Sequence, residues 1–317
     1  MVNSKAMPAG FSAEHRYYAF SRFLKEHFGT KVYRVTIDAG FTCPNVDGTV
    51  AVGGCVYCDN RSFSPNRRLP RATVREQVQR GVALLQERYR ADRFLAYFQA
   101  ATNTYAPVAK LRRLYEEALE HPQIVGLSIA TRPDCVPEPV LELLQGYARE
   151  RYVCLELGLQ SLHDRSLDWM NRGHHYDAFV DAVQRCQGRG LDLCAHVILG
   201  LPGETHADML ATAQALAGLP VDGAKIHNLH VVRDTPLETM YQAGEVRMFE
   251  RDEYVQLVCD FLELLPSRMV IHRLSGDAPP DYLVAPLWCL DKPRLLEAIR
   301  TELQRRDSWQ GKKQTHP

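Results

Sequence analysis

The chain has 317 residues, and its 38 lysines and arginines balance its 38 aspartates and glutamates. This length suits one large domain or two ordinary ones, and the balanced charge provides no global attraction to nucleic acid or to membranes. The first residues lack the apolar core of a secretory signal, and no stretch reaches the roughly 18 apolar residues of a membrane span. We therefore expect a soluble cytoplasmic protein with no membrane partner.

Apolar or alternating runs of strand length recur along the chain and alternate with segments of helical periodicity. Phe179, Ala182, Val183 and Cys186, for example, share one helical face. Such alternation predicts parallel strands with crossover helices, in an open sheet or in a complete or partial barrel. The six predicted strands span residues 32–39, 94–100, 124–130, 153–159, 191–199 and 224–230, and two later helices are predicted at 253–265 and 294–303.

Three cysteines, Cys43, Cys55 and Cys58, follow the first predicted strand. The Cys55-Val-Tyr-Cys58 spacing lets two sulfurs reach one metal centre, and the preceding Gly53 and Gly54 permit a tight turn. Three thiolates are one fewer than a closed zinc site or a fully protein-ligated iron-sulfur cluster needs, so an iron is left open for chemistry. A structural zinc site is the main alternative. A disulfide is disfavoured by the odd number of cysteines, and the six single cysteines are expected in the core.

Polar or glycine-rich segments follow four further predicted strands. They are residues 99–105, Thr131 to Asp134, Gln160-Ser161 and Gly200 to Glu204. Reacting groups of parallel barrels lie at the carboxyl ends of the strands, so these segments and the cysteines are expected to meet at one mouth.

Several of these motifs together resemble the radical S-adenosylmethionine (SAM) superfamily. They are the cysteine loop with Tyr57 before its last cysteine, Leu-Gly-Leu-Gln-Ser-Leu-His-Asp, and Val-Ile-Leu-Gly-Leu-Pro-Gly-Glu. The resemblance is to the YhcC-like branch, related to the catalytic subunit of Elongator and to oxygen-independent coproporphyrinogen oxidase. The eleven residues between Cys43 and Cys55 depart from the usual superfamily spacing and resemble the Elongator-like one.

The resemblance implies a domain organisation. An α/β fold is expected, with a partial (βα)6 barrel over residues 31–231. A helical lead-in at residues 1–30 precedes this barrel, and a small α+β carboxyl-terminal extension at residues 232–317 follows it.

The resemblance also implies two cofactors, a 4Fe-4S cluster and SAM. Cys43, Cys55 and Cys58 would ligate the cluster. Arg172 would contact the methionine carboxylate, for which a guanidinium fork is well suited, and the alternative is a surface salt bridge. The other residues implied to bind SAM are Gln160, His196, Ile198, Gly200, Asp59 and Asn60. A hydrogen-bonded core position is the alternative for His196.

One superfamily motif is replaced in this chain. Where a Gly-Gly-Glu motif is common after the second strand, the chain has Gln99-Ala100-Ala101. Thr102 and Asn103, which follow, offer either polar contacts or turn capping.

The implied activity is reductive cleavage of SAM to a 5'-deoxyadenosyl radical, in an oxidoreductase or a transferase served by a reductant such as flavodoxin or ferredoxin. The Elongator relationship suggests tRNA and wobble uridine modification. A small metabolite or a protein substrate stays open, as do a zinc-binding module and an iron-sulfur carrier. Two basic clusters are candidates for phosphate contacts: Arg67, Arg68, Arg71 and Arg75, and Arg305, Arg306, Lys312 and Lys313.

Two groups of residues bear on the substrate. Lys225, His227 and His230 are expected to line the barrel interior. The segment from His272 to Asp277 resembles part of the Elongator-type extension and is expected to close over the mouth, although ordinary surface polarity is the alternative for His272 and Arg273. The individual roles of His227, His230 and His272 are not assigned.

Overall fold

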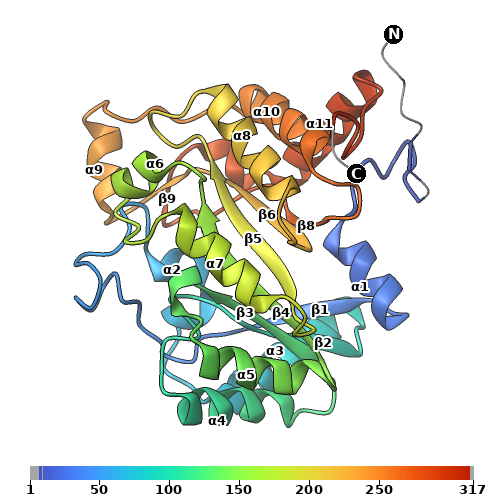
Figure 1. The fold of residues 1–317 in the computed structure, drawn as a ribbon, viewed down its shortest axis with the longest axis vertical. Helices are drawn as coiled ribbons and strands as arrows, with labels where there is room; N and C mark the ends of the chain where they lie inside the picture. The colour runs from blue at the N-terminus through green and yellow to red at the C-terminus, as the bar shows by residue number, and fades with distance from the viewer. Residues whose placement is uncertain (1–6, 9, 315–317) are drawn as a thin grey trace.

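A parallel sheet of seven strands, curled into a half-barrel, organises the molecule (Figure 1). The computed structural model describes residues 7–8 and 10–314. The strand order is β1-β2-β3-β4-β5-β6-β8, and β7 and β9 form a separate antiparallel pair. The strands are β1 (Val32–Ile37), β2 (Arg93–Phe98), β3 (Ile124–Thr131), β4 (Tyr152–Gln160), β5 (Asp192–Leu199), β6 (Gly223–Asn228), β7 (Val231–Val232), β8 (Val270–Arg273) and β9 (Leu283–Ala285).

Helices connect the strands and begin at residues suited to capping. Thr73 and Glu76 form a capping box at the start of α3, and Thr205 and Asp208 form another at α8, which ends before Gly218. The α-helices are α1 (Phe20–Phe28), α2 (Asn60–Phe63), α3 (Val74–Tyr89), α4 (Val108–Leu119), α5 (Glu138–Ala148), α6 (Asp164–Trp169), α7 (Tyr176–Cys186), α8 (His206–Ala217), α9 (Pro236–Gln242), α10 (Arg251–Leu264) and α11 (Lys292–Arg305). Short 3-10 helices span Pro65–Arg68, Pro133–Cys135 and Leu287–Leu290.

The predicted α/β partial barrel is confirmed, but the predicted strand count is too low. All six predicted strands are present, with ends shifted by one or two residues. The seventh, β8, belongs to the predicted extension and pairs in parallel with β6, with Gly223 opposite Val270. The barrel sheet thus continues past residue 231. The domain boundaries themselves stay a prediction.

The placement of β8 also decides between the two readings of His272. Its ring stacks on Phe20 of α1 with centroids 3.9 Å apart, and only 4% of its side chain is exposed. Ala19, just before α1, forms a parallel bridge with Ile271. The surface reading of His272 is therefore wrong, because pairing with β6 carries this residue into the interior.

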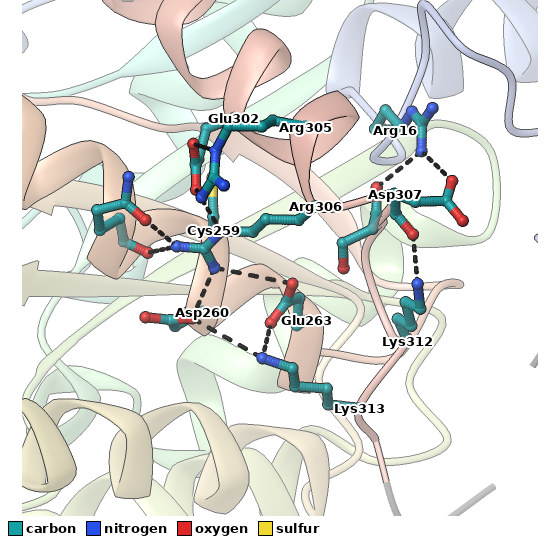
Figure 2. A network of polar contacts seen from close by, with 12 residues as sticks. Arg16, Cys259, Asp260, Glu263, Glu302, Arg305, Arg306, Asp307, Lys312 and Lys313 are labelled. Carbon is teal, nitrogen blue, oxygen red and sulfur yellow. Dashed lines mark hydrogen bonds and ion pairs between the residues drawn. The ribbon is translucent and has the colours of Figure 1, made fainter. Parts of the chain in front are cut away.

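The carboxyl-terminal helices pack on the barrel through α8, which α10 contacts, and α11 packs on α10 (Figure 1). Figure 2 shows the ion pairs at this contact: Arg306, just after α11, contacts Asp260 of α10 at 2.7 Å and also Glu302 of α11 itself at 2.5 Å. Arg305 contacts Glu302 as well, and Lys313 pairs with Glu263. Three members of the second basic cluster therefore have carboxylate partners within the fold.

The described part of the chain also answers two simpler predictions. The six single cysteines are buried, as expected: Cys135, Cys154, Cys186, Cys194, Cys259 and Cys289. None of the described helices combines the length and apolar character required to cross a bilayer.

Candidate active site

A cavity of about 520 Å³ opens where the carboxyl ends of the strands meet the loop after β1. Most of the predicted site residues line it: Cys43, Cys55, Cys58, Asn60, Gln160, Arg172, His196 and Ile198. Asp59 and Gly200 are not among its lining residues. The fold thus brings together residues that are up to 155 positions apart in the sequence.

The cysteine loop is fixed mainly by the segment that follows α6. The Val56 amide donates to the Met170 carbonyl at 3.1 Å, and the Asn171 side-chain amide donates to the Gly54 carbonyl at 2.8 Å. A β-carbon at Gly173, where φ is +70°, would lie 2.3 Å from Asn45 Oδ1, so only glycine allows this close approach. Asn45 in turn directs its amide toward Cys55 Sγ at 3.6 Å. Loop and segment therefore form one rigid unit around the thiols.

Arg172 extends from this unit into the cavity beside the thiols. Its Nη1 lies 3.7 Å from Cys55 Sγ, and its Nη2 donates to the Gly158 carbonyl at 3.1 Å. Its buried Nε has no partner among the described residues. Although burial lowers the pKa of Arg172, the neighbouring Cys55 raises it above its ordinary value, so the guanidinium stays charged. A surface salt bridge, the alternative reading, does not describe this buried side chain.

The thiols are close enough to influence one another. Burial, followed by Cys55 and Cys43, raises the pKa of the Cys58 thiol well above its ordinary value. Such a thiol becomes a thiolate only when a cation or metal compensates the charge. The three sulfurs do not, however, all lie within 4.8 Å of one another.

A second group of potential metal ligands lies outside the cysteine loop. One ligand atom each of Cys154, Glu156 and His272 lie within 4.8 Å of one another. Glu156 already pairs with Arg34 and Lys225. These two cations make the position unfavourable for a metal ion.

Strained backbone surrounds the cavity at the ends of β2 and β4. Gln160 has φ of +72° at a register shift in the β4-β5 pairing. Ala100 and Ala101 have φ of +71° and +58°, the region that glycine favours. These alanines keep a glycine-like backbone where Gly-Gly is common in the superfamily. The Asn60 side chain accepts from the Ala101 amide at 3.0 Å and helps to hold this conformation.

Three other residues from the sequence analysis, Asn103, Asp59 and Gly200, make contacts that stabilise the local fold. Asn103 donates to the carbonyls of Ala100 and Ala130, which supports its turn-capping reading. Asp59 caps α2 by accepting from the Arg61 amide at 2.8 Å. Gly200, with φ of +92°, packs so closely on Phe249 that a β-carbon would lie 2.9 Å from its ring.

A buried carboxylate that sequence reasoning missed, Glu156 of β4, contacts three side chains that line the cavity: Tyr97, His196 and Lys225. Its oxygens accept hydrogen bonds from side chains on five other strands, at 2.7 to 3.0 Å: Arg34, Tyr97, Ser128, His196 and Lys225. His272 Nδ1 of β8 lies 3.8 Å away, too far for a hydrogen bond. Although burial alone would raise the pKa of Glu156, Lys225 and the histidines hold it well below its usual range. The predicted ribose contact His196 therefore also has a structural partner.

Lys225, His227 and His230 line the cavity as predicted, and His230 lies beyond the end of β6. Arg273 of β8 lines it as well. Burial lowers the pKa of Lys225 to about 8, with Glu156 opposing and Arg34 adding to this shift. The interior thus places a titratable amine beside a fixed carboxylate.

A parallel half-barrel with an open set of cysteines at its carboxyl-terminal mouth defines the class of protein. Residues 49–216 match the model of the radical SAM superfamily, and residues 221–305 match that of the radical SAM C-terminal domain. The chain belongs to the radical SAM superfamily.

Its similarity to individual proteins is consistent with this membership. The chain is 42% identical to YtqA of Bacillus subtilis (strain 168) over 304 residues, covering 95% of this chain and 94% of YtqA. It is 41% identical to YhcC of Escherichia coli (strain K12), covering 85% of this chain and 86% of YhcC. A weaker similarity, 27% over 212 residues, reaches the tRNA uridine(34) acetyltransferase of Dehalococcoides mccartyi (strain CBDB1), with 66% of this chain and 44% of that protein covered.

Among solved structures, the archaeal Elp3 of Methanocaldococcus infernus superposes with a TM-score of 0.67 at 17% identity. The match covers 88% of this chain and 64% of the Elp3 chain. This likeness concerns the fold.

Proposed function

We propose that this chain is a radical SAM enzyme whose Cys43, Cys55 and Cys58 hold a 4Fe-4S cluster that leaves one iron for SAM. The observation that carries the proposal is the convergence of three thiols, an unpaired arginine nitrogen and the strained Gln160 on one cavity. The superfamily membership supports the same cofactors.

The residues present fit these two groups. The three thiols line one cavity together with Arg172, whose charged guanidinium can neutralise part of the cluster charge. Its free Nε can donate to a carboxylate such as that of the methionine end. A β-carbon at Gly158 would lie 2.5 Å from Arg172 Nη2 and 2.7 Å from Gln160 Nε2. The glycine therefore leaves the space in which both side chains reach the cavity.

A cluster held by Cys43, Cys55 and Cys58 would supply reductive cleavage of SAM to a 5'-deoxyadenosyl radical, with the electron coming from a reductant such as flavodoxin or ferredoxin, and this radical chemistry would remove hydrogen from the substrate. The chain itself orients the cosubstrate through Arg172 and Gln160. The cavity walls limit the access of water to the reacting atoms. The product is an oxidised or group-modified substrate, which makes the enzyme an oxidoreductase or a transferase.

For the substrate we propose tRNA first, with wobble uridine modification as the reaction. The support is the similarity to a tRNA uridine(34) acetyltransferase and the Elp3-like fold. In the first basic cluster, Arg67 pairs with Asp38 and Arg75 with Glu120, whereas Arg68 lies at the cavity. A small metabolite or a protein side chain is the alternative substrate class.

The test is anaerobic cluster reconstitution, reduction with dithionite, addition of SAM and chromatographic detection of 5'-deoxyadenosine. We expect this product from the wild type and not from Cys58→Ala. Cys43→Ala and Cys55→Ala should also lose the cluster. Cys259→Ala, which removes a buried thiol of α10, is the matched control and should keep both the cluster and the product. Equal iron content in all variants would refute the ligand assignment. A brown protein without product would favour a cluster carrier, and a colourless zinc protein would favour a binding module.

A further inference from the structure

The part of the cavity formed by β6 and β8 is lined by basic side chains. Lys225 of β6 lies opposite Arg273 of β8 in the register, and His227 follows two residues later on the same face of β6. The ring of His227 stacks near that of His196, with centroids 5.7 Å apart. Two cations and an imidazole thus meet along β6 and β8.

These side chains retain hydrogen-bonding capacity. An ammonium group has three donors, and Lys225 uses two of them, toward Tyr97 at 2.6 Å and Glu156 at 2.7 Å. His227 Nε2 is buried without a partner among the described residues. Arg273 has a single distant ion pair, 3.5 Å to Asp277, and 28% of its side chain is exposed. A buried polar atom without a partner is costly, so a ligand at this position would be stabilised.

The charged residues around this position indicate the sign of the charge that such a ligand would carry. Four cationic side chains, Arg34, Lys225, Arg273 and Lys292, influence one another at this end of the barrel, against the two carboxylates of Glu156 and Asp277. Burial lowers the pKa of His227, and the groups that lower it further are Arg273, Lys225, His196 and His230, all cationic or able to become so. The excess positive charge favours an anion.

We propose that Lys225, His227 and Arg273 form a subsite for an oxyanion of the substrate, a phosphate or a carboxylate group. The inference rests on the proposed function, because it assigns this end of the cavity to the substrate and the cysteine end to the cofactors. The subsite would hold the substrate between the cofactors and the loop after β8, where Asp277 lines the cavity. Substrate selection would then depend on the carboxyl-terminal extension.

The test is calorimetric titration of the reconstituted protein with inorganic pyrophosphate and, separately, with succinate. We expect at least one anion to bind. Arg273→Gln should weaken that binding about 10- to 100-fold, the usual effect of losing a charged hydrogen-bond donor, while SAM affinity is retained. Arg273→Lys should recover part of the binding. Arg268→Gln, at an exposed arginine just before β8, is the matched control and should bind as the wild type does.

The two anions distinguish the source of the oxyanion. Pyrophosphate binding alone supports a phosphate-bearing substrate such as a nucleic acid, and succinate binding alone supports a carboxylate. Should Arg273→Gln fail to fold, His227→Leu removes the unpartnered nitrogen and should also weaken binding. The subsite would be overturned if neither anion bound. It would also be overturned if the Arg273 and His227 variants bound the anion as tightly as the wild type does. Since this readout does not need SAM cleavage, a protein that cleaves SAM but binds no anion refutes the subsite alone.

Discussion

The three nitrogens of the Arg172 guanidinium have different surroundings, and this difference suggests how the side chain binds a ligand. Nη1 contacts a cysteine sulfur, Nη2 donates to the Gly158 carbonyl, and Nε is buried with no partner in the described part of the chain. Arg132 fixes the backbone at this position, because its Nη1 donates to the Arg172 carbonyl at 2.7 Å. The guanidinium is therefore held in place before any ligand binds, which reduces the entropic cost of binding.

We expect Arg172→Ala to retain the cluster and to weaken SAM binding about 10- to 100-fold, since one charged hydrogen-bond donor to a carboxylate is lost. Iron content and SAM titration of the reconstituted variant provide the measurement. Arg172→Lys should show an intermediate affinity, because it keeps the charge without the planar fork. An Ala variant that keeps its iron and binds SAM like the wild type would contradict this role.

Residue types together with the family resemblance were sufficient to predict part of this site. The cysteine triplet and Gln160 stand in motifs, and Lys225 stands out as a charge within a strand. Glu156 is also a charged residue within a predicted strand, the apolar run 153–159, but it was not singled out from the sequence. Its importance depends on partners from strands distant in the sequence, and no local pattern contains that information.

At the scale of elements, periodicity predicted the six long strands but not β8. This strand has four residues, and His272 and Arg273 interrupt its apolar pattern. Its existence depends on pairing with β6 and on packing against α1, which are both tertiary effects. The same tertiary pairing explains why His272 is buried, which excludes ordinary surface polarity, the alternative that its sequence context left open.

The attachment of α11 to α10 makes a second prediction possible. Arg306 has 17% of its side chain exposed and contacts Asp260 and Glu302, which are themselves mostly buried (Figure 2). Arg306→Ala leaves these carboxylates without this cation, and we expect it to lower the free energy of unfolding by about 1–2 kcal/mol. Urea unfolding monitored by circular dichroism provides the measurement.

Arg305→Ala is the matched control, because the same Glu302 is its partner but 69% of its side chain is exposed. We expect little change, as is usual for solvent-exposed ion pairs. If the two variants lost the same stability, the buried network would not be what attaches α11.

At the scale of the whole molecule, Glu156 connects the half-barrel. It lies on β4, the central strand, and its carboxylate contacts one side chain from each of the other six strands of the sheet. An open half-barrel lacks the closing hydrogen bonds of a complete barrel. Side-chain contacts across its interior can supply a connection that the backbone does not. Tyr97, His196 and Lys225 of this network also line the cavity, so the stability of the sheet and the shape of the site are coupled.

This network predicts a loss of stability in acid. Burial, followed by Lys225, lowers the pKa of His196 to about 4, and burial lowers that of His272 to about 4 as well. Both are 6.5 in the unfolded chain. Between these values the unfolded chain binds more protons than the folded one, so stability is fully present above pH 6.5 and is lost as the pH falls toward 4. Each histidine contributes a slope of about 1.4 kcal/mol per pH unit.

Urea unfolding at constant ionic strength between pH 6.5 and 5 measures this slope. His174, His227 and His230 shift in the same direction and add to it in the wild type. His272→Gln removes a single titrating group and should reduce the average slope over this range by about 1 kcal/mol per pH unit, whatever it does to stability at neutral pH. The slope separates the two effects, because lost packing on Phe20 lowers stability equally at every pH. A variant with the wild-type slope would mean that His272 is not held neutral by its surroundings.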